Sequence, residues 1–201
     1  MTFDIIGRAS EDATFGTERL SLRDILRAAT AGNHAALDRA LAGLDLTAHS
    51  DLSRFLAIQL AARAGIERWL DQSCPPSWVP PPQTGLIADD LAALGSLPCA
   101  YPAPRFEPGP DADWLGPAYV VAVSHLGNRL LLAQAGPALP REARRFLTGN
   151  AMQDYARRLR RLLGEAPGPS GAAAAIAAAR AAFAHFRDCV GLFARATRAR
   201  A

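Results

Sequence analysis

The sequence predicts an all-α protein built as a single domain, and three observations support this fold class. Apolar residues recur three and four positions apart through most of the chain, which is helical spacing. β-Branched residues gather only in one short run, AYVVAVS at 118–124, and this run leads directly into helical spacing. The 201 residues are half hydrophobic, so one domain can bury a sizeable core. We therefore expect one domain over 1–201, with an N-terminal arm at 1–19 and a helical core at 20–195.

Six to eight helices are expected, and the first three lie in the N-terminal half. Residues 21–44 repeat apolar side chains at helical spacing, and Ser50 suits the N-cap of a second helix. The segment 74–85 contains five prolines and cannot continue that helix. A short helix at 86–95 ends at Gly95, a residue type that commonly follows a helix C-terminus.

The C-terminal half contains the remaining helices. After an irregular connection, Pro117 suits the first position of a helix, because its missing N–H group is not needed there. A stretch rich in glycine and proline precedes the final, alanine-rich helix. The helices expected here cover 118–136, 140–147, 150–163 and 172–197.

Composition argues against several functional classes. The net charge is only +3, the arginines are dense only at 157–161, and aromatic residues make up 7% of the chain, so no nucleic-acid partner is expected. Cys74, Cys99 and Cys189 are far apart and odd in number, which predicts neither a disulfide framework nor a structural zinc site. The first residues do not resemble a signal peptide, and no segment suits membrane insertion. We expect a cytoplasmic protein.

One helical segment carries an unusual set of polar residues. Arg27 lies seven residues before His34, and Asp38 lies four residues after it. On a helix of about 3.6 residues per turn, these offsets place the three side chains on neighbouring parts of one face. A cation, an imidazole and a carboxylate in one row fit a ligand site, and they also fit an ordinary solvated helix edge.

Six segments, taken in order, carry a resemblance to a known family over about residues 20–190. Each motif by itself is weak evidence for a family, and the six motifs in this order are stronger evidence than any one of them. The segments are LRAATAGNHAALD, SDLSRFLAIQLAA, GLIADDLAALG, AYVVAVSHLGNRLLL, FLTGNAMQDYARRLRRLL and AAARAAFAHF. They resemble helices of the heme oxygenase family, particularly its bacterial biliverdin-producing branch.

The resemblance implies a helical fold in which heme lies between a proximal and a distal helix. His34 matches the proximal ligand of the heme iron, and neutral imidazole is a good iron ligand. Asp38 then accepts the second ring N–H and fixes the tautomer. Arg27 matches a cation that reaches a heme propionate, and Arg157 and Arg158 are candidates for the other propionate.

The distal segment departs from the family pattern. Gly127 keeps one glycine that allows close approach of the backbone, and Ser124 matches a polar position beside distal water. Val123 and Asn128 replace two further glycines, and Val123 is expected to crowd the oxygen pocket because it is β-branched. His125 has no counterpart in the pattern, and a regular helix turns it away from the side on which Gly127 lies.

The resemblance implies a heme oxygenase that cleaves heme to biliverdin, carbon monoxide and iron. Heme is then both substrate and cofactor, O₂ is the co-substrate, and electrons come from a redox partner such as a ferredoxin or a reductase. The chain has no GxGxxG fingerprint for a nucleotide of its own. The alternative, favoured by Val123, His125 and Asn128, is a non-catalytic heme-binding sensor, carrier or interaction protein with the same fold.

Overall fold

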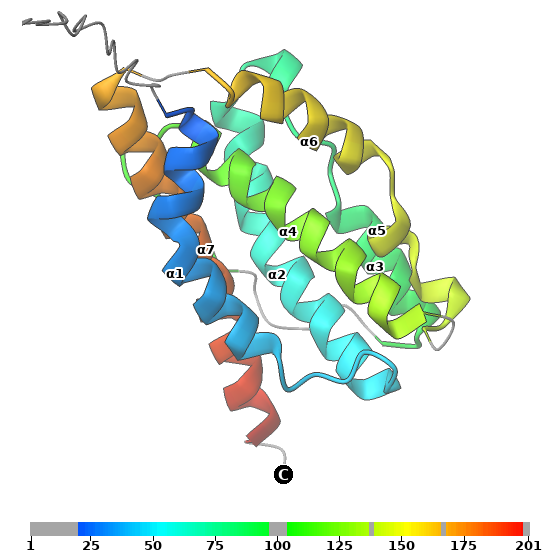
Figure 1. Ribbon diagram of the computed structural model, residues 1–201. Helices are drawn as coiled ribbons and strands as arrows, with labels where there is room; N and C mark the ends of the chain where they lie inside the picture. The colour runs from blue at the N-terminus through cyan, green and yellow to red at the C-terminus, as the bar shows by residue number, and fades with distance from the viewer. Residues whose placement is uncertain (1–19, 97–103, 137–138, 166–167, 199–201) are drawn as a thin grey trace, which may run out of the picture.

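The computed structural model describes residues 20–96, 104–136, 139–165 and 168–198, and the expected arm at 1–19 lies outside them. The described part is all-α, as predicted, and contains no strand (Figure 1). Two short 3₁₀ turns, η1 (Pro76–Trp78) and η3 (Arg141–Ala143), accompany the α-helices. The α-helices are α1 (Leu22–Leu41), α2 (His49–Ser73), α3 (Thr84–Ala93), α4 (Leu115–Ala135), α5 (Arg145–Thr148), α6 (Ala151–Leu162) and α7 (Pro169–Arg198).

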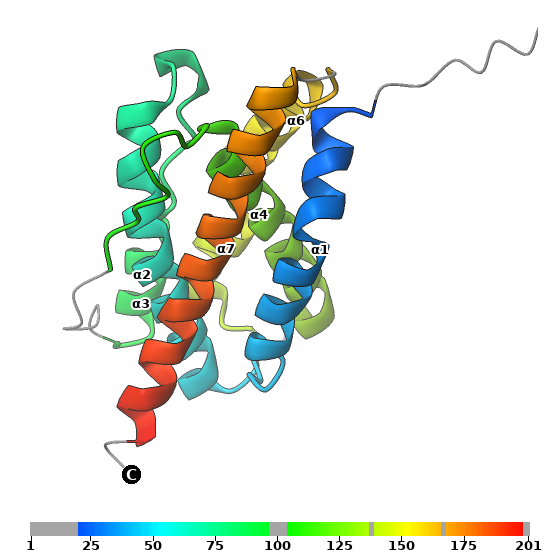
Figure 2. The same cartoon turned by 90° about the vertical axis from the view of Figure 1, so that its left-hand side faces the viewer.

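The long helix α7 organises the packing. α1, α2 and α4 all pack against it, and it runs the length of the molecule between α1 and α2 (Figure 2). The buried residues of α7 are mostly alanines and phenylalanines. The alanines allow the neighbouring helices to approach α7 closely. An added Cβ at Gly116 of α4 would lie 2.3 Å from the Ala175 carbonyl oxygen of α7. Glycine is therefore needed at this crossing, because any side chain would push the two helices apart.

The start of α1 is joined to the end of α6 by main-chain hydrogen bonds. Ser21 caps α1 by accepting from the Asp24 N–H at 3.2 Å. The N–H groups of Leu22 and Arg23, which have no partner within their own helix, donate to the carbonyls of Glu165 (3.1 Å) and Leu163 (2.9 Å). This joint brings α1 and α6 together at one end.

A second, smaller core lies where α3 and α5 meet the first half of α2. Asp90 of α3 is fully buried there, and its carboxylate accepts from the N–H groups of Arg145 (3.1 Å) and Phe146 (2.9 Å). Burial raises the pKa of Asp90, while these hydrogen bonds and Arg145 act in the opposite direction. A side chain from another helix thus caps the start of α5.

Three helix boundaries differ from the sequence prediction. The second helix begins at His49 with Ala48 as its N-cap, two residues before the predicted cap Ser50. α4 begins at Leu115, so Pro117 lies inside the first turn rather than at its first position. The helix expected over 140–147 is a 3₁₀ turn followed by the single turn of α5. The described helices include none that is both long and apolar enough to span a membrane.

Candidate functional site

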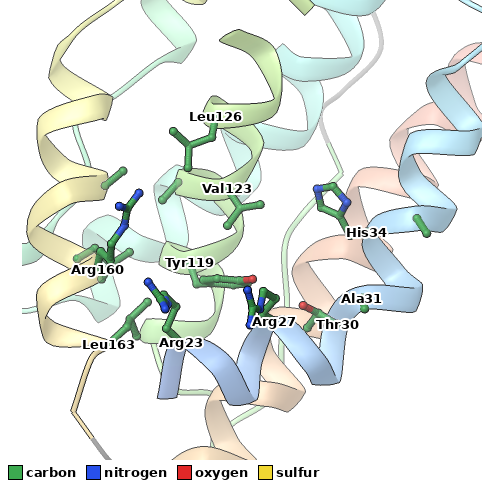
Figure 3. Close-up of a pocket in the computed structure, with 14 residues that line it drawn as sticks. Arg23, Arg27, Thr30, Ala31, His34, Tyr119, Val123, Leu126, Arg160 and Leu163 are labelled. Atoms are coloured by element: carbon green, nitrogen blue, oxygen red, sulfur yellow. The ribbon is translucent and has the colours of Figure 1, made fainter. Parts of the chain in front are cut away.

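A cavity of about 600 Å³ lies between α1 on one side and α4 and α6 on the other (Figure 3). This volume falls within the range of small-molecule and cofactor sites, roughly 300–1,000 Å³. The residues that line it come from one face of each helix, at spacings of three and four. They are Arg23, Arg27, Thr30, Ala31, His34, Ala35, Tyr119, Ala122, Val123, Leu126, Ala156, Leu159, Arg160 and Leu163.

His34 is the side chain of this cavity whose chemistry suits a metal ion. It projects from α1 into the space that separates α1 from α4, at about the level of Val123 (Figure 3). Its Nδ1 lies 2.9 Å from Oδ2 of Asp38, one turn further along α1. The ring also makes an edge-on contact with Phe183 of α7, with centroids 5.8 Å apart. With Nδ1 bonded to Asp38, Nε2 is the nitrogen left to bind a ligand.

Three arginines lie together at one end of the cavity. Arg23 and Arg27 come from α1 and Arg160 comes from α6, so the joint between these helices brings the three cations close together (Figure 3). Asp24 lies beside Arg23 at 3.3 Å and Arg27 at 3.4 Å, but it is not part of the lining. The described lining contains no carboxylate, so this end is positively charged and suits an anionic ligand group.

Tyr119 places a phenol near the same end. Burial raises the pKa of Tyr119, while the Thr30 hydroxyl and the positive charges of Arg27 and Arg23 act to lower it. Thr30 itself donates to the Leu26 carbonyl at 2.7 Å. The positive end of the cavity thus has hydroxyl groups beside its guanidinium groups, and the rest of the α4 wall is apolar.

The predicted distal residues lie on α4 at different distances from the cavity. Val123 lines it, as expected of a side chain in the place of a family glycine. Gly127 is not in the lining, but an added Cβ there would meet no atom within 4 Å, so open space lies beside it. Ser124 faces α2, where its Oγ accepts from Nη2 of Arg63 at 3.2 Å. His125 is fully buried and also lies outside the lining.

Two predicted arginines of α6 point elsewhere, and a third takes their place. Arg157 pairs with Asp154, and Arg158 lies over the ring of Trp78, 5.4 Å from its centroid. Neither lines the cavity, whereas Arg160 does. The signal for Arg160 was present in the sequence. It lies four residues after Ala156 and three before Leu163, so helical spacing places it on the apolar side of the helix with them. Our prediction did not take this spacing into account.

The donor set fits a flat, largely apolar ligand with a metal near one face and carboxylates at one end. The imidazole of His34, oriented by Asp38, supplies the metal ligand, and the arginine group supplies guanidinium donors for carboxylates. Elsewhere in the described part, no cluster of three His, Cys, Asp or Glu side chains is arranged to hold a metal ion. Sequence reasoning also missed Arg23, which lies one turn before Arg27 on the same face of α1, and Tyr119, whose place in the cavity depends on the packing of α4 against α1.

Comparison with known proteins shows the fold. No family model matches the chain, and no curated protein matches its sequence. A solved structure from a study of the NO-bound and CO-bound heme oxygenase of Neisseria meningitidis superposes with a TM-score of 0.70. The two chains are 20% identical, and the similarity covers 87% of this chain and 92% of the other. The protein therefore has the heme oxygenase fold, as its sequence motifs predicted.

Proposed function

We propose that the cavity between α1, α4 and α6 binds heme and that the protein is a heme oxygenase. The observation that carries this proposal is His34, held by Asp38 and lining a mostly apolar cavity whose other end has three arginines. The shared fold supports the same ligand class. Cleavage of heme to biliverdin, carbon monoxide and iron follows from the family resemblance and is the finer part of the proposal.

Each wall has a proposed role. Nε2 of His34 holds the iron, and Asp38 fixes the tautomer and orientation of the imidazole through Nδ1. Arg27, joined by Arg23 and Arg160, binds the propionates through charge-assisted hydrogen bonds. The propionate role shifts from Arg157 and Arg158, which point away from the cavity, to these lining arginines.

The α4 wall packs on the other face of the ligand and excludes water. Ala122, Val123 and Leu126 supply an apolar surface, and the open space beside Gly127 leaves room for a flat ring to approach the helix backbone. Ser124 is proposed to hold distal water by rotating between Arg63 and the cavity. When bound, heme supplies the iron that activates O₂ and is itself the compound that is oxidised.

Electrons are proposed to come from an external carrier such as a ferredoxin or a reductase. Arg158 and Arg161 lie on the exposed side of α6, next to the helix face that lines the cavity, and they give an acidic carrier a positive surface to contact. The cytoplasmic location remains a prediction from the sequence.

A non-catalytic heme-binding protein is the second candidate, and the position of Val123 favours it. This side chain projects into the cavity where the family pattern has glycine, so it reduces the space available for O₂. A sensor or carrier tolerates that loss of space, whereas an oxygenase would turn over more slowly.

Hemin titration tests the binding proposal. The wild-type protein should take up one hemin per chain with the absorption spectrum of an imidazole complex, and His34→Ala should lose that spectrum while its circular dichroism stays helical. His49→Ala is the matched control, since His49 is exposed at the start of α2. A His34→Ala complex with the same spectrum as wild type would contradict the assignment of the ligand.

Turnover separates the two candidate functions. Under air with a reductant, an oxygenase loses its Soret band and a bilin absorption replaces it, whereas a sensor or carrier keeps its heme intact. Val123→Gly should accelerate heme loss if the valine crowds O₂. The helix cost of this change is about 1 kcal/mol, so thermal stability is measured alongside. A wild-type complex that stays intact for hours would favour the second candidate.

A further inference from the structure

A layer of buried polar side chains lies between α2 and α4, on the side of α4 that faces away from α1. Gln59 and Arg63 are one turn apart on α2, and Ser124 and Asn128 are one turn apart on α4. Arg63 is fully buried, Gln59 is 2% exposed and Asn128 is 3% exposed. The two helices lie side by side with opposite chain directions (Figure 1), so the bond from Arg63 to Ser124 brings Gln59 level with Asn128.

The hydrogen bonds of the Arg63 guanidinium in the described part of the chain go to neutral groups. Nε donates to Oε1 of Gln59 at 3.3 Å, and Nη2 donates to Oγ of Ser124 at 3.2 Å. The ring of Phe146 covers one face, with its centroid 5.0 Å from Cζ. Among the described residues Nη1 has no acceptor, and Nδ2 of Asn128 has none either. Two buried donors in one layer are therefore left without an acceptor.

Glu67 attracts the charge of Arg63, but the two side chains form no ion pair. Glu67 lies one turn after Arg63, and burial outweighs its attraction and lowers the pKa of Arg63 to about 10. The carboxylate of Glu67 instead accepts from the Gln83 N–H (2.9 Å) and the Thr84 hydroxyl (3.0 Å) at the start of α3. Arg63 thus stays charged at neutral pH, and no ion pair joins it to a described residue.

A buried charge without a partner is among the most costly features of a protein interior. Water would satisfy the two free donors, but it would leave the charge uncompensated. A compact anion satisfies the donors and the charge together, and it makes charge-assisted hydrogen bonds that are shorter and stronger than neutral ones. The two donors without an acceptor and the positive charge of Arg63 both indicate an anionic ligand.

We propose that Arg63, Ser124 and Asn128 form a buried binding site for a monovalent anion of halide size, within the α2–α4 interface. The anion accepts from Nη1 of Arg63 and Nδ2 of Asn128. The site lies behind the wall of the cavity rather than in its lining, and it shares Ser124 with the position proposed for distal water.

Thermal unfolding in chloride tests this site on the wild-type protein without added heme. At constant ionic strength, replacing gluconate by about 500 mM chloride should raise Tm by about 3–6 °C, because a ligand that binds only the folded state stabilises it by mass action. Gluconate is the reference anion because it is too bulky for a buried layer. Equal Tm values in the two salts would overturn the proposal.

Two variants and one crystallographic measurement locate the effect. Arg63→Met should abolish the chloride response, whereas Arg68→Met, which removes an exposed arginine of the same helix, should keep it. A chloride response that survives in a folded Arg63→Met would contradict the assignment. Should that variant not fold, anomalous diffraction from wild-type crystals in bromide decides. An anomalous peak beside Nη1 of Arg63 is expected, and a water without anomalous signal there would overturn the site.

Discussion

At the scale of single residues, the imidazole and the arginines of the cavity lie at different positions along α1. His34 lies in the second half of the helix, and Arg23 and Arg27 lie in the first half, near Arg160. Helical spacing was enough to predict that Arg27, His34 and Asp38 share a face, and the structure places Asp38 in contact with Nδ1. Arg160 on the opposite wall was also accessible to helical spacing, since it lies four residues after Ala156 and three before Leu163, but the prediction chose Arg157 and Arg158 instead.

Arg27→Glu tests the positive end of the cavity. The change replaces a guanidinium by a carboxylate next to Asp24, so a ligand carboxylate would meet repulsion instead of attraction. We expect hemin affinity to fall about tenfold, which corresponds to roughly 1.4 kcal/mol. Fluorescence quenching on hemin addition measures it. Arg39→Glu, an exposed position in the last turn of α1, is the matched control. Equal affinities in the two variants would assign Arg27 to a solvated edge.

At the scale of elements, the distances between helices are set by small residues and by main-chain groups. Gly116 allows α4 to cross α7 in contact with the Ala175 carbonyl, and Asp90 holds the start of α5. Neither feature is visible in the sequence, because each depends on a residue more than fifty positions away. The same reason explains the error over 140–147, where local periodicity predicted one helix and a contact from α3 set the start of a shorter one.

Gly116→Ala should destabilise the protein by about 2–3 kcal/mol, since overpacking a tight contact forces backbone shifts. The added methyl would lie 2.3 Å from the Ala175 carbonyl oxygen and 2.7 Å from the Ala179 nitrogen. Gly127→Ala on the same helix is the matched control, because its Cβ would meet nothing within 4 Å and alanine favours helix by about 1 kcal/mol. Urea unfolding compares them. Equal stability in the two variants would show that α4 and α7 adjust without cost.

At the scale of the whole molecule, α7 links the cavity wall α1 to the core helix α2. Arg180 donates to the Ala29 carbonyl of α1 from Nε (3.2 Å) and Nη2 (3.1 Å), and His185, one turn and a half later, is buried toward α2. The sequence predicted both helices and their order. It did not predict which titratable groups would be buried, since His185 shows no special pattern in an alanine-rich segment.

The stability of the protein should fall in mild acid because of His185. Burial lowers the pKa of His185, and the backbone of Ala62 and the charge of Asp188 oppose this only in part. The unfolded chain therefore binds the proton more readily, so the free energy of unfolding decreases as pH falls below about 6.5 and gains nothing above it. Urea unfolding at about pH 7.5 and about pH 5.5 measures the loss.

His185→Gln should lose less stability than the wild type between these two pH values, because it removes the titrating group and keeps a polar side chain. His49→Gln, at an exposed position, should behave as the wild type does. A loss in His185→Gln as large as in the wild type would assign the acid sensitivity to groups other than His185.

The joint between α1 and α6 bears on how this protein tolerates mutation over evolution. The closed end of the cavity depends on the N–H groups of Leu22 and Arg23 and on two main-chain carbonyls, not on any side chain. Every amino acid except proline supplies that N–H group. Replacements of Arg23, which lines the cavity, therefore leave the joint between α1 and α6 in place while they alter the charge and shape of the space beside it, whereas Leu22 is fixed by its place in the core. Proteins with this fold can therefore change their ligand through single substitutions in the cavity while the fold is kept.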